Sequence, residues 1–458
     1  MTLPLYVQGA WFIGALLFIV GLKGMSSPAS ARQGIVWAGY GMLIAIAGTF
    51  LIPGLRNLAL MLAALGIGGA AAWISGKKVK MTDMPQMVAI YNGMGGGAAA
   101  AIAAIEFARA GSHSVVVITL AVIGALIGSV SFTGSCIAYA KLQGLLKKAH
   151  RLPAQNVVNV LLALAALGFG AAMIVLAPAQ PWLILVFFAI ALVLGVIVTL
   201  PIGGADMPVV ISLFNAFTGL AVGFEGYVLG NPALIIAGIV VGAAGTLLTQ
   251  LMAKAMNRPI SNILFTPMVA SSASGQAIEG TMKELSALDA AAMMRYASKV
   301  IIVPGYGMAV AHAQHKVWEM TSILEEAGVA VKFAIHPVAG RMPGHMNVLL
   351  AEAGVPYDKI FDLEEINNEF GSTDVSLVIG ANDVVNPVAR TDKSSPIYGM
   401  PILNADHAHN VICIKRGKGA GYSGIENALF YGENTRMLYG SAQQAINQVI
   451  QHVKELAG

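Results

Sequence analysis

Charged residues are scarce in this sequence. Asp, Glu, Lys and Arg together make up 11% of its 458 residues, and apolar residues make up 57%. A soluble protein carries about a quarter charged residues, so the composition predicts a membrane protein. The charge is also unevenly placed. Thirteen basic and four acidic residues give residues 1–258 a net charge of +9, whereas fourteen basic and nineteen acidic residues give residues 259–458 a net charge of −5. The chain therefore combines two different kinds of domain.

Cysteine is nearly absent. Cys136 and Cys413 lie in different halves of the chain, so the sequence offers neither a disulfide framework nor a metal site. No basic stripe with interleaved aromatic residues is present, which argues against nucleic-acid binding. The N-terminus lacks the basic segment and the small-residue cleavage site of a signal peptide, so we expect residues 3–22 to remain as a first membrane span.

Long apolar runs dominate the first half. A membrane-spanning helix needs about 20 apolar residues, and segments of this kind lie at 3–22, 35–53, 57–75, 84–106, 114–138, 156–177, 181–200, 208–229 and 232–253. Basic residues gather after the first, third, fifth and ninth segments, as Lys23, Arg32, Lys77, Lys78, Lys80, Lys141, Lys147, Lys148, Arg151, Lys254 and Arg258. Loops rich in Lys and Arg stay in the cytoplasm. We therefore expect an integral protein of a bacterial inner (plasma) membrane, with its N-terminus outside and its C-terminal domain in the cytoplasm.

Polar residues inside the spans are rare, which makes them candidates for function. Asn92 and Asn215 each lie roughly 12–14 Å along a span that begins on the cytoplasmic side, at 1.5 Å per residue. The two amides either line one polar path or bond across helix interfaces. Asp206, at the cytoplasmic mouth of the eighth span, is either an ordinary interface residue or a gate. Glu106 and Glu225 lie near the outer ends of their spans, where we expect them to be solvated.

The composition changes at about residue 257. Residues 257–297 are rich in Ser, Ala and Thr and indicate a linker with one short helix at 287–296. Beyond it, strands and helices alternate as in a parallel α/β sheet. The expected strands are 299–304, 330–335, 359–363, 375–379, 411–414 and a short one at 401–403, and the expected helices are 308–326, 345–352 and 441–456. We thus predict a multi-span membrane domain of about nine helices (1–256), followed by a soluble Rossmann-like α/β domain (298–458).

A glycine motif follows the first expected strand. Gly305, Gly307 and Val310 form a GxGxxV pattern at the start of a helix, where Rossmann domains bind a dinucleotide phosphate. A plain strand–helix turn produces the same pattern, so it is a weak signal by itself. Its Gly-Tyr-Gly triplet is not a potassium filter, because it does not lie between membrane spans. Asn382 and Asp383 follow another strand, at the end where such sheets bind ligands. A carboxylate there is either functional or caps the next turn.

Several features favour NADP over NAD. The second strand ends at Ile335-His336, without the Asp or Glu that holds a ribose 2′-hydroxyl and would repel a 2′-phosphate. Lys415 and Arg416 follow a strand and precede a run of glycines. They either close over a phosphate or form a solvated basic turn. Arg341 is a further candidate for a phosphate contact.

Several segments of the sequence, taken together, resemble those of one protein family. They are 203–208 with Asn215, 304–310, 336–347 (HPVAGRMPGHMN), 380–383 (GAND) and 415–422. With the nine spans and the NADP features, they are similar to the beta subunit of proton-translocating NAD(P) transhydrogenase, and the resemblance covers nearly the whole chain. HPVAGRMPGHMN and GAND are long enough to be specific, whereas GxGxxV is not.

The resemblance implies an activity that the residues alone do not show. Hydride passes directly from NADH, held by a separate alpha subunit of one or two chains, to NADP(H) held on this chain. The transfer is coupled to proton translocation through the membrane half. Direct transfer needs no catalytic acid or base, which agrees with the lack of a catalytic triad in the sequence. The resemblance also implies a homodimer within an alpha–beta complex.

The resemblance assigns a proton path to the membrane half. Asn215 and Asp206 match its channel and gate positions, and Asp383 matches a residue near the nicotinamide that takes part in coupling. Some family members have a histidine where Asn92 stands here, and others have asparagine. Asn does not titrate, so protons passing Asn92 must move through water or through protonation of another group such as Asp206.

The resemblance also assigns the nucleotide contacts. Lys415 and Arg416 match the binders of the 2′-phosphate, and Tyr422 ends the loop that covers the nucleotide. Ser441 stands where the family often has Asp. The full set of implied contacts is Gly305, Tyr306, Gly307, Val310, Val338, Ala339, Gly340, Arg341, Met342, Pro343, Gly380, Ala381, Asn382, Asp383, Val384, Gly399, Met400, Lys415, Arg416, Gly417, Lys418, Gly419, Ala420, Gly421, Tyr422, Ser441 and Ala442.

Two other function classes fit part of the pattern. A transporter or channel regulated by a cytoplasmic nucleotide-sensing domain binds the nucleotide without turnover. It should show interrupted helices in matching halves, which the sequence lacks. A membrane dehydrogenase that passes electrons to quinone needs a flavin or metal relay. Two cysteines, and no histidine inside a predicted span, argue against such a relay.

Overall fold

The computed structural model describes residues 3–109, 114–146, 150–176, 180–204, 206–265, 280–417, 421 and 423–456. The chain forms two compact units. One consists of Met1–Ile202 and Val209–Thr249, and the other of Gly203–Pro208 and Gln250–Gly458.

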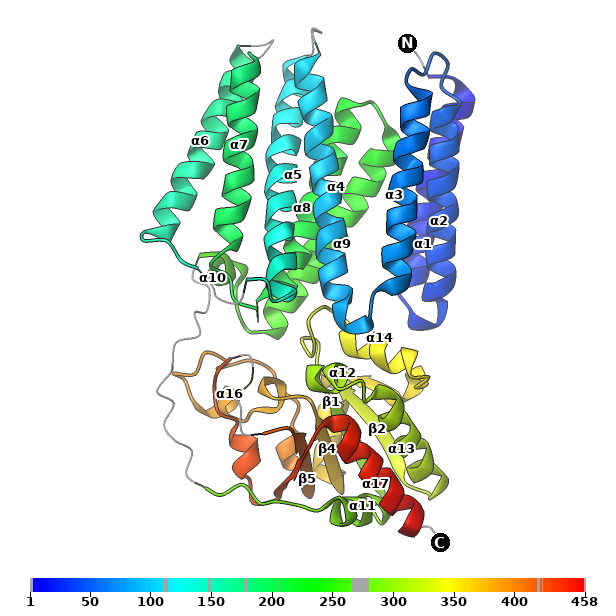
Figure 1. Ribbon diagram of the computed structural model, residues 1–458, viewed down its shortest axis with the longest axis vertical. Coiled ribbons are helices and arrows are strands. Elements are labelled where there is room, and N and C mark those ends of the chain that lie inside the picture. Colours follow the sequence, from blue (N-terminus) through cyan, green and yellow to red (C-terminus); the bar gives the residue numbers. More distant parts are fainter. Residues whose placement is uncertain are drawn as a thin grey trace. The chain divides into compact units, whose positions relative to one another are not determined.

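Long apolar helices make up the first half of the described chain (Figure 1). They are α1 (Leu5–Met25), α2 (Pro28–Phe50), α3 (Leu58–Lys78), α4 (Met84–Ala108), α5 (Val115–Leu142), α6 (Gln155–Val175), α7 (Pro181–Thr199), α8 (Met207–Val228) and α9 (Pro232–Ala255), with a 3-10 turn η1 (Met81–Asp83) before α4. Among the described residues, nine helices are long and apolar enough to cross a membrane. The prediction of about nine spans is therefore confirmed.

Small residues let several of these helices approach closely. A Cβ atom on Gly96 of α4 would lie 2.9 Å from the backbone oxygen of Gly128 in α5. One on Gly14 of α1 would lie 2.9 Å from the backbone oxygen of Gly41 in α2. There is no room for a larger side chain at these points, so the helices pack through their glycines, as is common between membrane helices.

A six-stranded parallel sheet forms the centre of the C-terminal half. The strands are β1 (Lys299–Pro304), β2 (Ala330–Ile335), β3 (Ile360–Asp362), β4 (Val375–Ile379), β5 (Asn410–Lys415) and β6 (Thr435–Tyr439), in the order β3-β2-β1-β4-β5-β6. Val300 of β1 pairs with Val331 of β2 on one side and with Val375 of β4 on the other. The strand order reverses between β1 and β4, as in a Rossmann sheet. The predicted fold class is confirmed.

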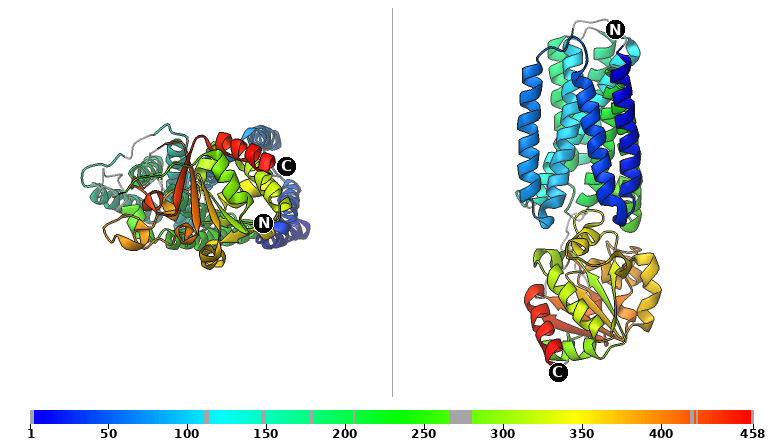
Figure 2. Two further views of the ribbon diagram at one scale, coloured as in Figure 1. Left: turned by 90° about the horizontal axis from the view of Figure 1, so that it is seen from below. Right: turned by 90° about the vertical axis from the view of Figure 1, so that its right-hand side faces the viewer.

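Helices flank this sheet (Figure 2). They are α11 (Ala287–Arg295), α12 (Tyr306–Val310), α13 (Gln314–Glu326), α14 (His345–Glu352), α15 (Leu363–Ile366), α16 (Val388–Thr391) and α17 (Ala442–Leu456); α10 (Ile260–Phe265) precedes them. The 3-10 helices are η2 (Tyr357–Lys359), η3 (Asn367–Ser372), η4 (Asp383–Val385), η5 (Ala405–His407) and η6 (Ala428–Tyr431). α17 packs against α11 and α13 through one apolar face, formed by Ala445, Ile446, Val449, Ile450 and Val453. Phe370 of η3 and Phe430 of η6 share a core cluster with Ile301 of β1 and Cys413 of β5.

Two expected elements differ from the structure. The helix expected at 308–326 is broken into α12 and α13, because His312 has a left-handed backbone (φ 52°) and the N–H of Ala313 turns back to the oxygen of Met308 at 3.1 Å. The strand expected at 401–403 is wrong. The segment is a loop in which Ile402 and Leu403 are buried, and the backbone oxygen of Ile402 accepts a hydrogen bond from the Asn367 side chain at 2.9 Å instead of joining the sheet.

The strand β6 is absent from the sequence-based prediction. Its five residues, Thr435–Tyr439, include one charged and two polar-ended side chains around a short apolar centre of Met437 and Leu438. Such a short segment gives almost no periodicity. Its place at the edge of the sheet becomes clear only from its pairing with β5.

His336 is buried directly after β2 and is fixed by two hydrogen bonds. Its Nε2 lies 2.7 Å from the backbone oxygen of Pro401, and its Nδ1 lies 3.2 Å from the backbone nitrogen of Val338. A carbonyl oxygen only accepts and an N–H only donates, so Nε2 carries the proton and Nδ1 does not. The imidazole is therefore neutral. Burial lowers the pKa of His336 to about 4, against the opposing effect of the bond to Pro401.

We expect His336 to make the C-terminal half less stable in acid. As the pH falls below 6.5, the unfolded chain takes up a proton that the folded chain refuses until about pH 4. The stabilisation is therefore complete above pH 6.5 and is lost as the pH falls towards 4, by roughly 1.4 kcal/mol per pH unit.

The variant His336→Gln can still donate to Pro401 but cannot take up a proton. Relative to this variant, the wild type should lose about 2 kcal/mol of stability between pH 7 and pH 5. Pulse proteolysis of the full-length chain in detergent, over a series of urea concentrations, measures this. The same stability difference between the two proteins at both pH values would contradict the assignment.

Candidate functional site

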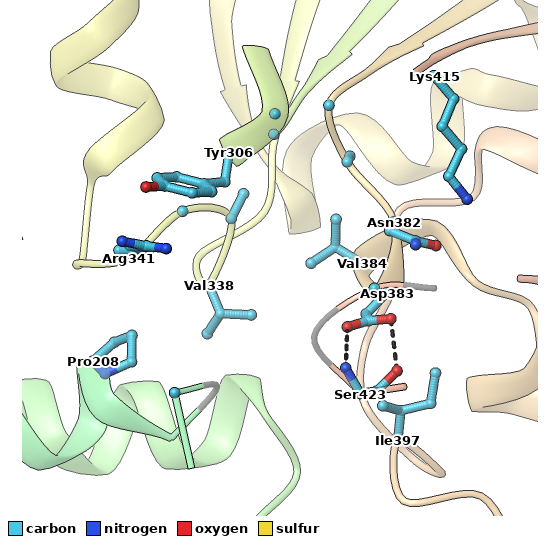
Figure 3. A pocket seen from close by; sticks show the side chains of 18 of the residues that line it. Pro208, Tyr306, Val338, Arg341, Asn382, Asp383, Val384, Ile397, Lys415 and Ser423 are labelled. Carbon is cyan, nitrogen blue, oxygen red and sulfur yellow. Dashed lines mark hydrogen bonds between the residues drawn. The ribbon is translucent and has the colours of Figure 1, made fainter. Parts of the chain in front are cut away.

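Loops that follow β1, β2, β4 and β5 surround a pocket (Figure 3). The C-terminal residues that line it are Gly305, Tyr306, Gly307, Ala311, Val338, Ala339, Gly340, Arg341, Gly380, Ala381, Asn382, Asp383, Val384, Pro396, Ile397, Met400, Ile414, Lys415, Arg416, Gly417, Gly421, Ser423, Gly440 and Ala442. In sheets of this order, ligands bind outside the carboxyl ends of the strands, where the strand order reverses. The pocket lies at that point, between the loops of β1 and β4.

The turns after β1 and β4 meet through their backbones. The N–H groups of Gly305 and Gly307 donate to the oxygens of Ile379 and Gly380, each at 2.9 Å. Gly380 has a φ of 74°, and a Cβ on Gly307 would lie 2.7 Å from the Cα of Gly380. Only glycine allows this approach. The GxG motif and the GAND motif therefore fit together without side chains, and they form a smooth part of the pocket wall.

Arg341 and Tyr306 form one side of the pocket. The guanidinium carbon of Arg341 lies 4.3 Å from the centre of the Tyr306 ring, a cation–π arrangement. The backbone N–H of Arg341 donates to Nδ1 of His345 at 3.1 Å. Gly340 has a φ of 113°, and a Cβ there would lie 2.7 Å from the His345 ring. The HPVAGRMPGHMN segment thus folds back on His345 and presents Arg341 to the pocket.

Asp383 and Ser423 form the other side. The Ser423 hydroxyl donates to Oδ1 of Asp383 at 2.7 Å, and its backbone N–H donates to Oδ2 at 3.0 Å (Figure 3). Nearby, the Asn427 side chain donates to both oxygens of Asn382, its backbone and its side-chain oxygen, at 2.9 Å each. These bonds tie the segment that follows β5 to the loop that follows β4.

Positive charge prevails in the part of the pocket that the C-terminal half provides. Arg341, Lys415 and Arg416 line it, against one carboxylate, that of Asp383. The Lys415 ammonium lies 4.2 Å from the centre of the Phe430 ring. Burial lowers the pKa of Lys415, and nearby negative groups, including Asp383, act in the opposite direction. The arrangement suits an anionic ligand. No group of three His, Cys, Asp or Glu side chains in the described part of the chain is placed to hold a metal.

Most of the contacts expected from the sequence line this pocket. Val310, Met342, Pro343, Gly399 and Ser441 are not among the lining residues. Lys418, Gly419, Ala420 and Tyr422 lie outside the described residues. Six of the C-terminal lining residues were not expected from the sequence: Ala311, Pro396, Ile397, Ile414, Ser423 and Gly440. Of these, only Ser423 carried a signal, as a hydroxyl group directly after the glycine-rich loop.

In the membrane half, polar side chains link three helices. The Asn92 amide donates to the Ser135 hydroxyl at 3.1 Å, and the Thr218 hydroxyl donates to the backbone oxygen of Asn92 at 3.3 Å. The hydroxyl groups of Ser131 and Thr218 lie 2.6 Å apart. Asn92 therefore bonds across the interfaces of α4 with α5 and α8. Within the described residues, no hydrogen bond joins it to Asn215.

Asp206 is buried and forms an ion pair. Arg258, which follows α9, donates from Nη1 to both carboxylate oxygens of Asp206, at 2.6 and 2.7 Å. The Asp206 side chain is fully buried and that of Arg258 is 11% exposed. Arg258 was expected only as one of the loop cations, because 52 residues separate it from Asp206 in the sequence. Breaking a buried pair by removing one partner costs about 3–5 kcal/mol.

The expectation that Glu225 is solvated is wrong. The residue is 1% exposed, and neither carboxyl oxygen has a hydrogen-bond partner among the described residues. It faces α5, since a Cβ on Gly124 would lie 2.6 Å from its Oε1. Its position near the end of α8 gave no information on the direction of the side chain. The side chain of Glu106 is also mostly buried, at 11% exposed, but it is paired with the exposed Arg109.

Comparisons with known proteins extend over almost the entire sequence. A family model described as NAD(P) transhydrogenase beta subunit matches residues 7–452. Two relatives from Rhodospirillum rubrum, one of them from a specified strain, are both named NAD(P) transhydrogenase subunit beta. Each is 46% identical over 458 residues, which cover 97% of this chain and 98% of the relative. Because both kinds of match span nearly the whole chain, this protein belongs to the NAD(P) transhydrogenase beta subunit family, a family of oxidoreductases.

Proposed function

We propose that this chain holds NADP(H) in a proton-translocating transhydrogenase. An alpha subunit holds NAD(H), hydride passes between the two nucleotides, and the membrane half couples this transfer to proton movement. The observation that carries the proposal is the pocket where the strand order reverses, in which Arg341, Lys415 and Arg416 outnumber the one carboxylate of Asp383.

The pocket suits a dinucleotide that carries a 2′-phosphate. Lys415 and Arg416 supply two adjacent positive charges, and we assign them to the 2′-phosphate. Arg341 supplies a third charge from the opposite side, stacked on Tyr306, and we assign it to another phosphate group. β2 is followed by the neutral His336 rather than by a carboxylate that would repel a 2′-phosphate.

The residues around Asp383 have a positioning role. NADP(H), when bound, supplies the hydride chemistry, and direct transfer requires alignment of two nicotinamides rather than a catalytic acid or base. The bonds from Ser423 to Asp383 join the two segments that enclose this side of the pocket. We assign Asp383 to coupling, because a change in its partners loosens or tightens both segments together.

The membrane half (1–256) supplies the proton path in this proposal, and a linker (257–297) connects it to the NADP-binding domain (298–458). Protons pass Asn92 through water and through the hydroxyl groups that are hydrogen-bonded to it. Asp206, paired with Arg258, serves as the gate. A proton that crosses 100 mV releases about 2.3 kcal/mol, which is enough to bias the hydride equilibrium strongly.

The partners and the location belong to the same proposal. The alpha subunit is one chain or two, and two alpha–beta units form a dimer. The basic loops support our proposal that the NADP-binding domain lies in the cytoplasm and the N-terminus outside, in a bacterial inner membrane.

Vesicles that contain this chain together with its alpha subunit should form NADPH from NADH and NADP. An uncoupler should change the rate several-fold, because it removes the opposing or driving proton gradient. This chain alone is the control, and it should bind NADPH without turnover. Lack of NADPH formation with both subunits present would sink the proposal. Nucleotide-dependent passage of a solute, without hydride transfer, would favour a regulated channel or transporter.

Lys415→Met should weaken NADPH binding roughly 10- to 100-fold, because a hydrogen bond to a charged group is worth about 1.5–3 kcal/mol. Binding of NADH, which lacks the 2′-phosphate, should change little. Nucleotide fluorescence titration measures both affinities. The matched control is Lys283→Met, since Lys283 is exposed and donates to the backbone oxygen of Glu433, away from the pocket. Equal losses for NADPH and NADH would refute the assignment to the 2′-phosphate.

Ser423→Ala removes the hydroxyl that holds Asp383. We expect NADPH to dissociate about tenfold faster, because this charge-assisted bond helps to close the site. Stopped-flow displacement of NADPH by excess NADP gives the rate. Ser394→Ala is the control, because Ser394 makes a similar bond to Asp392 in an exposed turn. An unchanged dissociation rate would show that the Ser423–Asp383 bond does not restrain the nucleotide.

A further inference from the structure

Glu225 is a buried carboxyl group in α8 with no part in the nucleotide site. It is 1% exposed, and its two oxygens have no hydrogen-bond partner among the described residues. An ionised carboxyl group without a partner costs several kcal/mol in an apolar interior. Such groups are rare inside membranes and mark proton or ion pathways. A purely structural role does not account for a carboxyl group in this position, because an apolar side chain would fill it at lower cost.

Glu225 lies on the same helix interface as the polar cluster around Asn92. Ser131 of α5 bonds to Thr218 of α8, and Gly124 of α5 contacts Glu225 of α8. The two contacts are seven residues apart in both helices, about two turns, so they lie on one line along the interface. We call this line the α5–α8 seam. Thr218 and Glu225 are separated by roughly 10 Å along it.

Small apolar residues occupy the seam between these two contacts. Ala221 of α8 is fully buried there, and a Cβ on Gly124 of α5 would lie 3.5 Å from the backbone oxygen of Ala221. They carry no hydrogen-bonding side chain, so the polar cluster is interrupted before it reaches Glu225. A short apolar constriction of this kind conducts only when water or a helix movement bridges it. In a proton-conducting membrane half, an interruption of this kind would keep protons from leaking when no hydride is transferred.

We propose that Glu225 is a proton-carrying group at the outer end of the α5–α8 seam. The inference rests on the proposed function, in which the membrane half conducts protons. A proton forms an O–H bond with one carboxyl oxygen of Glu225. That bond breaks when the proton passes along the seam, through water, to the hydroxyl groups of Thr218 and Ser131 and on to Asn92. No electrons are transferred in this step. Among the described residues, Glu106 of α4 is close enough to Glu225 to act on it electrostatically, and Glu106 is itself paired with Arg109.

The variant Glu225→Gln tests this role, because it keeps the shape of the side chain and removes the exchangeable proton. In vesicles with the alpha subunit, we expect NADP reduction and proton uptake to fall together by at least about tenfold. The affinity of the purified chain for NADPH should change by less than about twofold, because the nucleotide site is intact. Glu225→Asp keeps a carboxyl group and should retain an intermediate rate. Ser129→Ala is the matched control. Ser129 is another buried residue of α5 whose hydroxyl has no described partner, and it lies on a different face of the helix from Ser131. This variant should reduce NADP and take up protons at the wild-type rate.

Infrared difference spectra give an independent readout. The difference between the NADP-bound and NADPH-bound complex should contain a carboxyl C=O band that shifts in Glu225→Asp and is absent in Glu225→Gln. If the Gln variant fails to assemble, the shift of the carboxyl band in Glu225→Asp still tests whether Glu225 is the group that gives this band.

Normal proton uptake by Glu225→Gln overturns the inference, as does a carboxyl band that is the same in both variants and the wild type. A slow Gln variant that has also lost NADPH binding overturns it too, because that pattern indicates a structural role. The proposed function fails separately, if wild-type vesicles form no NADPH.

Discussion

The backbone contact between the turns after β1 and β4 determines what the C-terminal half can bind. Gly305 and Gly307 lie against Gly380 so closely that no side chain fits between them, and two N–H···O bonds hold the turns in register. Asp383 follows this contact on the loop after β4. Arg341 comes from the loop after β2 and stacks on Tyr306, so Asp383 and Arg341 stand on opposite sides of a wall made of backbone. Phosphate groups are large and need such an open surface with cations around it. The cations come from Arg341, Lys415 and Arg416.

The membrane half obeys a related constraint, since lipid offers no hydrogen-bond partners. Asn92, Ser135, Thr218 and Ser131 therefore satisfy one another across α4, α5 and α8. Asp206 is neutralised by Arg258 in the same way. Glu225 has no such arrangement among the described residues. Polar groups that bond to fixed neighbours hold the helices rigidly together. A buried carboxyl group without hydrogen-bond partners is less costly with a proton bound than in its ionised form. A proton carrier must bind a proton in this way.

Much of the fold follows from local pattern in the sequence. Length and hydropathy are enough to predict the nine long helices, and the alternation of strands and helices is enough to predict a parallel sheet. The GxG, HPVAGRMPGHMN and GAND motifs meet because strands of a parallel sheet end at the same edge. Contacts between residues that are far apart in the sequence cannot be predicted from local pattern. Examples are the contacts of Arg258 with Asp206 and of Ser423 with Asp383. The inward direction of Glu225 depends on how α8 packs against α5, and β6 depends on its pairing with β5. None of these leaves a periodic signal.

The most direct test of the proposed coupling is an equilibrium measurement in sealed vesicles that contain both subunits and all four nucleotides. A known pH difference is imposed across the membrane, and the ratio of NADPH and NAD to NADP and NADH is measured once hydride exchange has reached equilibrium. If one proton crosses the membrane for each hydride, we expect this ratio to change about tenfold for each pH unit. A ratio that does not respond to the gradient while hydride exchange continues would contradict the coupling of the two halves.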